Sequence, residues 1–270
     1  MGYYINVEAN VNIYIEDLNP EGKKTILFLH GWPGSHELFE YQFNKLAFQG
    51  YRCIGMDQRG FGKSDQPLNG YGYDRLSDDV RCVMDALNLQ DITLLGHSTG
   101  GSIAVRYMNR HRAYGVKKLV LCAAAAPSLI KRHNFPYGVP RENIEAMIRL
   151  TDTDRPQMLR SFGANFFFQN INPPMMDWFF QLGLMAAGWA TSEVEKTWIE
   201  EVLFSDLENI TTPTLIMQGI HDEVVPFSLG EIQRKMIRNS NLIPFECSGH
   251  ALFIEERDRF NKELMCFVEA

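Results

Sequence analysis

The sequence has few cysteines, and their spacing excludes two common roles of cysteine in proteins. Five occur among 270 residues, scattered and without a Cys-x-x-Cys pair: Cys53, Cys82, Cys122, Cys247 and Cys266. Such a set argues against a disulfide framework and against a zinc site. Isolated cysteines of this kind are typically small buried side chains in a protein of a reducing compartment.

Long apolar runs and basic runs are also missing. No stretch is apolar for long enough to span a bilayer, and residues 1–18 lack the basic start and apolar core of a secretory signal. The formal net charge is −7, and no cluster of Lys or Arg forms an electrostatic footprint for nucleic acid. We therefore expect a soluble cytoplasmic protein that binds neither nucleic acid nor a membrane.

Short apolar runs alternate along the chain with stretches of helical period. The runs are apolar on both faces, as strands must be when helices cover both sides of a parallel sheet. After alternating, strand-like residues over 3–15, strands are predicted at 25–30, 51–57, 91–97, 116–126, 213–222 and 241–248. Helices are predicted at 36–48, 73–88, 99–111, behind 222 and up to about 269. This order predicts an α/β fold with a doubly wound, mostly parallel sheet.

The alternation stops between the strand run that ends at residue 126 and residue 206. Residues 127–205 have no strand-like run and are rich in aromatic residues and methionine. We interpret them as an inserted helical lid, and residues 1–126 and 206–270 as the core of the fold. Trp178, Phe179 and Met185 are expected to help form the wall of an apolar substrate pocket.

One serine lies between glycines at the end of the predicted strand 91–97. The stretch Gly-His-Ser-Thr-Gly (96–100) places Ser98 where a strand gives way to a helix. A serine on such a strained turn exposes its hydroxyl, and the residues two before and two after it must be small, as Gly96 and Gly100 are. The helix that follows directs its positive dipole end at the same place. Ser98 is therefore the candidate nucleophile.

A serine hydroxyl needs a base, and histidine is the usual one. Among seven histidines, His250 follows the last predicted strand, where the carboxyl ends of parallel strands gather their functional residues. His97 is next to the serine and is expected to point to the other side of the turn. Asp222, at the end of the penultimate strand, is the candidate that orients His250, whereas the adjacent Glu223 is expected to face away.

The negatively charged oxygen of a tetrahedral intermediate needs two amide donors. One is expected from the backbone of Thr99, directly after the nucleophile. The other is expected from the loop 31–35, and we assign it to Trp32.

The motifs together resemble those of the α/β-hydrolase family. The stretches concerned are 30–35 (HGWPGS), 57–65 (DQRGFGKSD), 96–101 (GHSTGG), 219–226 (GIHDEVVP) and 248–250 (SGH). Residues 98–111, 118–127 and 176–187 resemble the cofactor-free haloperoxidase and perhydrolase–arylesterase subgroup, in which Phe often replaces the residue at His97. This resemblance implies a metal-free and cofactor-free Ser-His-Asp enzyme. It also implies ester hydrolysis, with peracid formation and consequent halide oxidation as side activities.

The function predicted from these residues is a carboxylesterase-like serine hydrolase. Its substrates are expected to be small to medium, largely apolar acyl or aryl esters or lactones. A carbon–carbon bond hydrolase or enol-lactonase with the same triad is an alternative, which an arginine in the pocket would favour. Four lid arginines, whose directions the sequence leaves open, are relevant to it: Arg141, Arg149, Arg155 and Arg160. A ligand receptor on a hydrolase fold is an alternative of another class, and self-association is left open.

Overall fold

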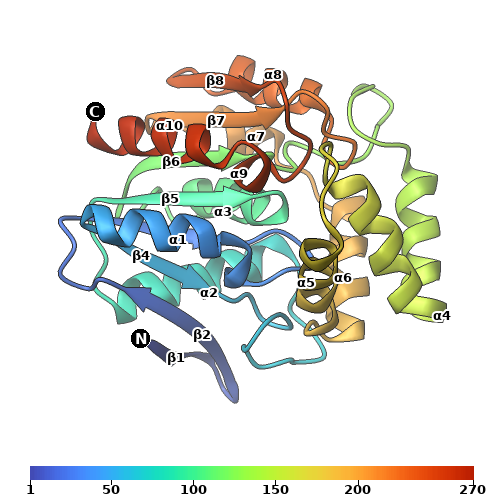
Figure 1. The fold of residues 1–270 in the computed structure, drawn as a ribbon, viewed down its shortest axis with the longest axis horizontal. Helices are drawn as coiled ribbons and strands as arrows, with labels where there is room; N and C mark the ends of the chain where they lie inside the picture. The colour runs from blue at the N-terminus through green and yellow to red at the C-terminus, as the bar shows by residue number, and fades with distance from the viewer.

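The computed structural model describes all residues, 1–270, and is built around one sheet of eight strands (Figure 1). The spatial order of the strands is β1-β2-β4-β3-β5-β6-β7-β8. β1 and β2 are antiparallel to each other and β2 is antiparallel to β4, whereas the strands from β4 to β8 in this order are parallel. The bounds are β1 (Gly2–Glu8), β2 (Val11–Leu18), β3 (Lys24–Leu29), β4 (Tyr51–Met56), β5 (Ile92–His97), β6 (Val116–Cys122), β7 (Thr214–Gly219) and β8 (Ser240–Phe245).

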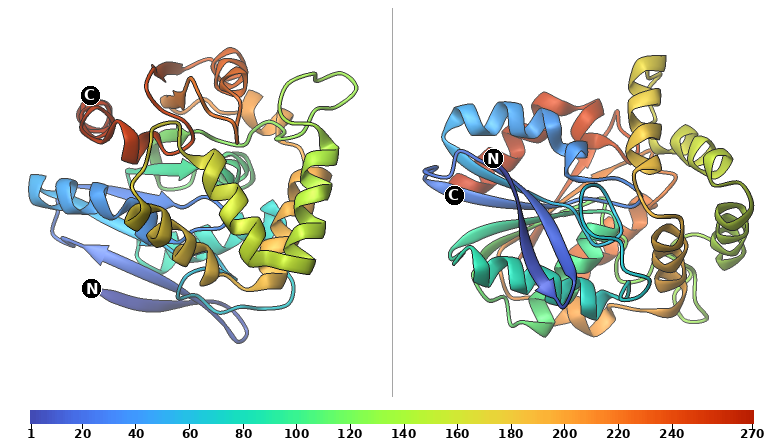
Figure 2. Two further views of the ribbon diagram at one scale, coloured as in Figure 1. Left: turned by 45° about the vertical axis from the view of Figure 1, so that its right-hand side comes forward. Right: turned by 90° about the horizontal axis from the view of Figure 1, so that it is seen from below.

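Helices cover both faces of the sheet, as the alternating pattern predicts. α1 (Glu40–Leu46) and α10 (Arg257–Glu269) pack together on one face (Figure 2). The other face carries α2 (Tyr73–Ala86), α3 (Thr99–Arg110), α7 (Phe204–Glu208) and α8 (Phe227–Met236). The short α9 (Leu252–Glu255) precedes α10, and two 3-10 turns, η1 (His36–Phe39) and η2 (Ala47–Gln49), flank α1.

The central strands are buried on both faces. Every residue of β5 and of β7 is buried, whereas in β1 only the inward-facing Ile5 and Val7 are. These strands belong to one continuous cluster of 75 buried hydrophobic residues. The predicted α/β fold class, with its doubly wound and mostly parallel sheet, is confirmed.

The segment between β6 and β7 supplies the helices that lie over the carboxyl ends of the parallel strands (Figure 1). They are α4 (Arg141–Phe166), α5 (Pro173–Leu184) and α6 (Gly188–Glu200). α4 is bent at Asp154, whose φ of −152° and ψ of 73° interrupt the helix two residues before Pro156.

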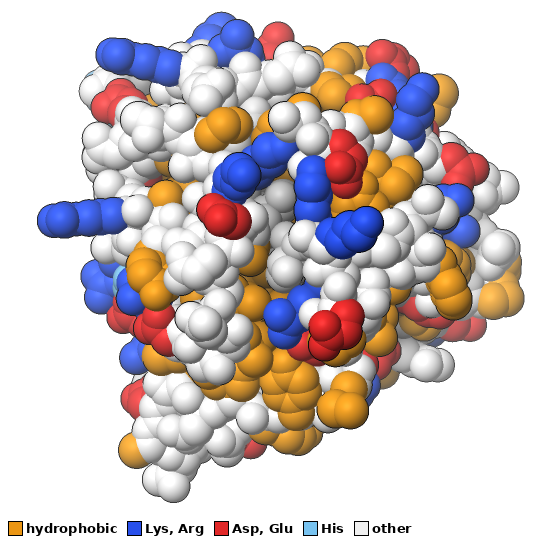
Figure 3. Space-filling model, turned by 90° about the vertical axis from the view of Figure 1, so that its left-hand side faces the viewer, with side chains coloured by type: hydrophobic (Ala, Val, Ile, Leu, Met, Phe, Trp, Pro, Cys, Tyr) orange, Lys and Arg blue, Asp and Glu red, His pale blue; other side chains and the backbone are white.

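The opposite pole is the face at which the parallel strands begin (Figure 3). Basic, acidic and hydrophobic side chains are interspersed on it. Two lysines there stabilise the end of α10, because Lys24 Nζ donates to Val268 O (3.1 Å) and Lys118 Nζ donates to Phe267 O (2.7 Å). No helix of the structure combines the length and apolarity that crossing a bilayer requires.

Candidate active site

Ser98 occupies the sharp turn between β5 and α3. Its φ of 53° and ψ of −119° lie in a region that residues other than glycine rarely adopt. The turn is held because Ser98 N donates to Cys122 O (2.9 Å) and Ser98 O accepts from Gly101 N (2.9 Å). A Cβ atom on Gly96 would lie 2.4 Å from Gly100 O, and one on Gly100 would lie 2.3 Å from Leu29 O. The two glycines flanking the turn therefore have the close packing that the motif requires.

His250 and Asp222 come together at the ends of β8 and β7. His250 Nδ1 lies 2.7 Å from Asp222 Oδ2, and both side chains are buried. The other ring nitrogen of His250, Nε2, is buried and has no hydrogen-bond partner. The backbone of His250 is fixed from the lid, because its N–H donates to Phe166 O (3.0 Å).

Asp222 is held by donors on both of its carboxylate oxygens. Oδ1 accepts from the backbone amides of Val224 (2.9 Å) and Val225 (2.7 Å). Oδ2 accepts from Gln218 Nε2 (2.8 Å) in addition to its contact with His250. Together these hydrogen bonds fix the plane of the carboxylate next to the His250 ring.

His97 is buried behind His250 rather than in contact with solvent. Its Nε2 lies 3.1 Å from the backbone oxygen of His250, and the two ring centroids are 4.6 Å apart. Burial, followed by the neighbouring His250, holds the pKa of His97 well below its ordinary value. His97 is therefore a neutral packing residue behind the site, with Phe166 and Phe253 against its ring edges.

The two predicted oxyanion-hole residues follow β5 and β3. Thr99 is the first residue of α3, and Trp32 lies in the loop after β3. The turn, loop and capping hydrogen bonds include none donated by the backbone amide of Trp32 or Thr99. Their side chains, by contrast, are bonded to α6: Trp32 Nε1 donates to Thr191 O (3.1 Å), and Thr99 Oγ1 accepts from Trp198 Nε1 (3.0 Å).

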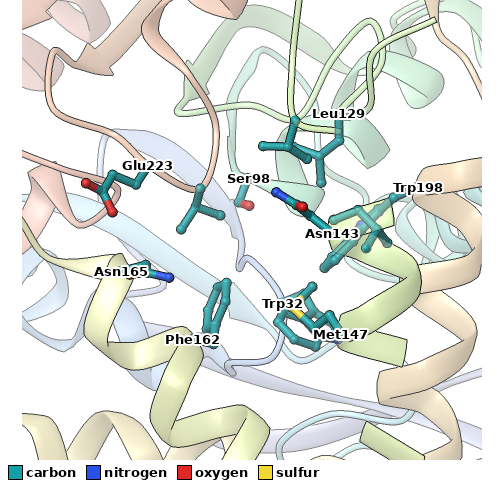
Figure 4. A pocket seen from close by; sticks show the side chains of 12 residues that line it. Trp32, Ser98, Leu129, Asn143, Met147, Phe162, Asn165, Trp198 and Glu223 are labelled. Atoms are coloured by element: carbon teal, nitrogen blue, oxygen red, sulfur yellow. The ribbon is translucent and has the colours of Figure 1, made fainter. Parts of the chain in front are cut away.

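A cavity of about 210 Å³ opens next to Ser98 between the core and the lid (Figure 4). Eight of its 12 lining residues are hydrophobic. The polar ones are Ser98, Asn143, Asn165 and Glu223, and no Lys or Arg lines it. The remaining lining residues are Trp32, Leu129, Val139, Ile144, Met147, Phe162, Trp198 and Val224.

The structure places the three pocket residues predicted from the sequence outside the lining of this cavity. Trp178, Phe179 and Met185 are not among the lining residues of this cavity. Phe179 is buried and packs against Phe166, with ring centroids 4.2 Å apart and the rings tilted by 31°. Trp178 packs against Tyr41, and Met185 is exposed at the end of α5. The α5 helix thus supports the cavity wall, whereas α4 and α6 form it.

The lining residues that were missed carry a helical signal. Ile144 and Met147 are three residues apart on α4, and Phe162 lies on the second half of the same helix. Sequence period alone places such residues on a buried helix face without saying what that face meets.

The lid arginines do not line the cavity either. Arg141 pairs with Glu145 (2.7 Å), Arg160 pairs with Asp177 (2.8 Å), and Arg155 donates to Gly183 O (3.1 Å). Arg149 is exposed on α4. No group of three or more His, Cys, Asp or Glu side chains is placed to hold a metal ion.

Comparison with known proteins identifies the family. A family model described as alpha/beta hydrolase fold matches residues 24–257. The chain is 42% identical over 267 residues to the AB hydrolase superfamily protein YisY of Bacillus subtilis, covering 99% of both chains. It is 32% identical over 276 residues to a non-heme haloperoxidase of Rhodococcus erythropolis, again covering 99% of both.

A solved structure agrees with these relatives. The esterase EaEST of Exiguobacterium antarcticum superposes with a TM-score of 0.97 at 40% identity, covering 100% of both chains. The resemblance predicted from the motifs is confirmed. This chain belongs to the α/β-hydrolase fold family, in its haloperoxidase-like subgroup.

Proposed function

We propose that this protein is a serine hydrolase that cleaves neutral carboxylic esters or lactones of small to medium apolar groups through an acyl-enzyme. The observation that carries the proposal is the buried His250–Asp222 pair next to an apolar cavity. Nε2 of His250 has no hydrogen-bond partner, and Ser98, on its strained turn, lines the cavity. The esterase and haloperoxidase relatives support the same class of chemistry.

In the proposed reaction Ser98 Oγ attacks the ester carbonyl carbon. Nε2 of His250 accepts the hydroxyl proton as the new C–O bond forms, and Asp222 stabilises the imidazolium. No hydrogen bond joins Ser98 Oγ to Nε2 here, and such bonds often tighten only when substrate is bound. The proton then passes to the leaving alkoxide as the ester bond breaks, which releases the alcohol and leaves Ser98 acylated.

Water completes the cycle by the same steps in reverse. His250 takes a proton from the water as its oxygen attacks the acyl carbon, and returns it to Ser98 Oγ as the acid leaves. Both tetrahedral intermediates would place their charged oxygen at the amides of Trp32 and Thr99. The loss of one such donor typically costs on the order of 10²–10³ in kcat.

The composition of the cavity supports a neutral substrate. Eight hydrophobic residues surround the space, the only charged lining residue is Glu223, and no cation lines it. A substrate carboxylate would therefore enter an apolar site without a partner, which is costly. This argues against a carbon–carbon bond hydrolase that acts on acids, because that hypothesis requires an arginine in the pocket.

The resemblance to cofactor-free haloperoxidases adds a side reaction to the proposal. Hydrogen peroxide can replace water as the nucleophile that attacks the acyl-enzyme. One peroxide oxygen then bonds to the acyl carbon, Ser98 leaves and regains its proton, and a peracid is released. Oxidation of halide by the free peracid needs no further group of the protein.

The test is turnover of p-nitrophenyl esters of increasing chain length by the purified wild type and by Ser98→Ala. We expect a loss on the order of 10⁶ in kcat in the variant, as for other serine hydrolases that lose their nucleophile. Turnover retained in Ser98→Ala would overturn the proposal. Tight ligand binding by a wild type that turns over no ester would favour the receptor alternative.

A further inference from the structure

One lid helix is bonded to both residues of the proposed oxyanion hole. Trp32 Nε1 donates to Thr191 O at the first turn of α6, and Trp198 Nε1, two turns further along α6, donates to Thr99 Oγ1. Trp32 and Trp198 also pack edge to face, with ring centroids 5.0 Å apart and an interplanar angle of 79°. All four of these residues are buried.

These contacts join two loops that follow neighbouring strands of the sheet, β3 and β5. Trp32 follows β3 and Thr99 follows β5, so their backbone amides belong to separate connections of the core. The spacing of the two amides decides whether both can reach one oxygen, and donors must lie within about 3 Å of it. α6 contacts both loops, and because a helix of this length is rigid, these contacts fix the distance between the loops.

α6 is itself fixed to the core at its two ends. At its start, Ala187 N donates to Gly60 O (2.9 Å). Beyond its end, Leu203 N donates to Pro127 O (2.8 Å). In its middle, Glu195 accepts from Thr151 Oγ1 of α4 (2.9 Å). These hydrogen bonds hold α6 in place at both ends and in the middle.

We propose that Trp198 is a positioning residue that sets the oxyanion hole through Thr99, and that α6 fixes the spacing of the Thr99 and Trp32 amides. The proposal rests on the proposed function, since it assigns a role within that site. Trp198 also lines the cavity, so its ring contributes to substrate binding as well. Its indole N–H is the part that is assigned to positioning, and the two roles are separable by substitution.

Positioning of the oxyanion hole has a specific kinetic signature. The developing charge exists in the transition state and not in the bound ester, so a misplaced amide lowers kcat and leaves KM nearly unchanged. A change in the wall of the pocket instead alters KM and the preference for chain length. The two effects can therefore be told apart in one set of variants.

The experiment compares Trp198→Phe, Thr99→Val, Thr99→Ser and the double variant Trp198→Phe/Thr99→Val. Trp198→Phe keeps an aromatic ring and removes the donor, Thr99→Val keeps the shape and removes the acceptor, and Thr99→Ser restores the acceptor. Trp189→Phe is the matched control, because Trp189 lies on the outer side of α6 and donates to Pro67 O (2.9 Å) away from the site. Burst amplitude and Ser98→Ala are measured alongside.

We expect kcat to fall about 10-fold in Trp198→Phe and in Thr99→Val, as for the loss of one hydrogen bond, with KM within about 2-fold. The double variant should lose no more than either single variant, because each removes the same interaction. Thr99→Ser should lose less kcat than Thr99→Val, because it restores the acceptor, and Trp189→Phe should retain the wild-type kcat.

A second measurement does not depend on turnover. A trifluoromethyl ketone accepts the Ser98 oxygen at its carbonyl carbon and places the resulting negative oxygen in the oxyanion hole, while His250 keeps the serine proton. Its inhibition constant should rise about 10-fold in Trp198→Phe and Thr99→Val, since every 1.4 kcal/mol is tenfold in affinity. An apolar ketone that forms no adduct should bind all variants alike.

The outcomes separate this inference from the proposed function. Unchanged kcat and unchanged trifluoromethyl ketone inhibition in both single variants, with a normal wild-type burst, would overturn the positioning role alone. A change confined to KM would likewise overturn it, because the indole would then serve only as pocket wall. A wild type without any Ser98-dependent burst would overturn the proposed function itself.

Discussion

The side-chain amide of Gln218 donates to Oδ2 of Asp222 over 2.8 Å, and this same oxygen lies 2.7 Å from Nδ1 of His250. Gln218 is buried on β7, four residues before Asp222, and its Nε2 also donates to Val225 O (2.9 Å). Asp222 thus shares the charge of one oxygen between an imidazole and a neutral amide. Removal of the amide is therefore expected to change the rate of the reaction.

Gln218→Leu should lower kcat about 10-fold, as for the loss of one buried hydrogen bond that positions Asp222. Without the amide, Oδ2 of Asp222 loses a donor that holds it next to Nδ1 of His250, so the carboxylate orients the imidazole less well. Gln233→Leu is the matched control, because Gln233 is also buried but donates to Ala124 O and Ala126 O instead. Equal kcat for wild type and Gln218→Leu would contradict this role of Gln218.

Glu195 should make the protein less stable as the pH rises. Burial raises the pKa of Glu195 from 4.5 to about 8, so the folded state holds this proton more tightly than the unfolded chain does. Stability is fully present below pH 4.5 and is lost progressively as the pH rises through 8. The free energy of unfolding of Glu195→Gln should therefore exceed that of wild type by an amount that grows over this range, on the order of a few kcal/mol at most.

Denaturant unfolding at pH 5, 7 and 9 measures this difference. The Gln carbonyl can still accept the hydrogen bond from Thr151, so the comparison isolates the ionisation. Glu193→Gln is the control, because Glu193 is on the same helix but pairs with Lys196 at the surface (2.7 Å). A constant gap between Glu195→Gln and wild type at all three pH values would contradict the assignment.

His97 should reduce stability on the acid side. Because burial holds its pKa well below the ordinary value of 6.5, the unfolded chain takes up the proton first as the pH falls. The stability that neutral His97 contributes is present above pH 6.5 and is lost on acidification. The melting temperature of His97→Phe should therefore fall less between pH 8 and pH 5 than that of wild type. A thermal melt of both proteins at the two pH values tests it, and parallel losses would refute it.

Glu223 should select among substrates by charge. It is exposed at the edge of the cavity and is the only charged residue that lines it. Relative to a neutral ester of the same shape, kcat/KM should be higher for an ester bearing a trimethylammonium group and lower for one bearing a carboxylate. Glu223→Gln should lower the ratio of kcat/KM for the trimethylammonium ester to kcat/KM for the carboxylate ester about 5-fold. This is the change expected for an interaction of roughly 1 kcal/mol between partly solvated charges.

Two comparisons guard this prediction. Glu231→Gln, at an exposed position on α8 outside the cavity, should leave the ratio unchanged. The wild-type ratio should shrink as salt is added, because exposed charges are screened. An unaltered ratio in Glu223→Gln would show that its charge does not reach the substrate.

The core of the fold could be predicted because its signals are local. The run at 91–97 matches β5, and the helical period at 73–88 matches α2, since apolar strands and amphipathic helices carry their own periodicity. The predicted strand 116–126 was too long, because β6 ends at Cys122. Ala124 and Ala126 lie beyond the sheet, and their carbonyl oxygens accept from Gln233 Nε2 on α8. No local sequence pattern predicts this contact.

The site divides in the same way. Ser98, Asp222 and His250 follow the parallel strands β5, β7 and β8, whose carboxyl ends lie at one edge of the sheet, so their approach follows from topology. The pocket wall depends instead on how lid helices rotate against the core. Phe179 fits an apolar pattern as well as Phe162 does, yet the ring of Phe179 packs against Phe166 while Phe162 lines the cavity.

The measurement that tests the central claim most directly is the mass of the enzyme quenched during turnover of p-nitrophenyl acetate. We predict a gain of one acetyl group, located by peptide mapping on Ser98 and absent in Ser98→Ala. Rapid turnover without any acylated protein, or an acetyl group on a residue other than Ser98 at full occupancy, would contradict it.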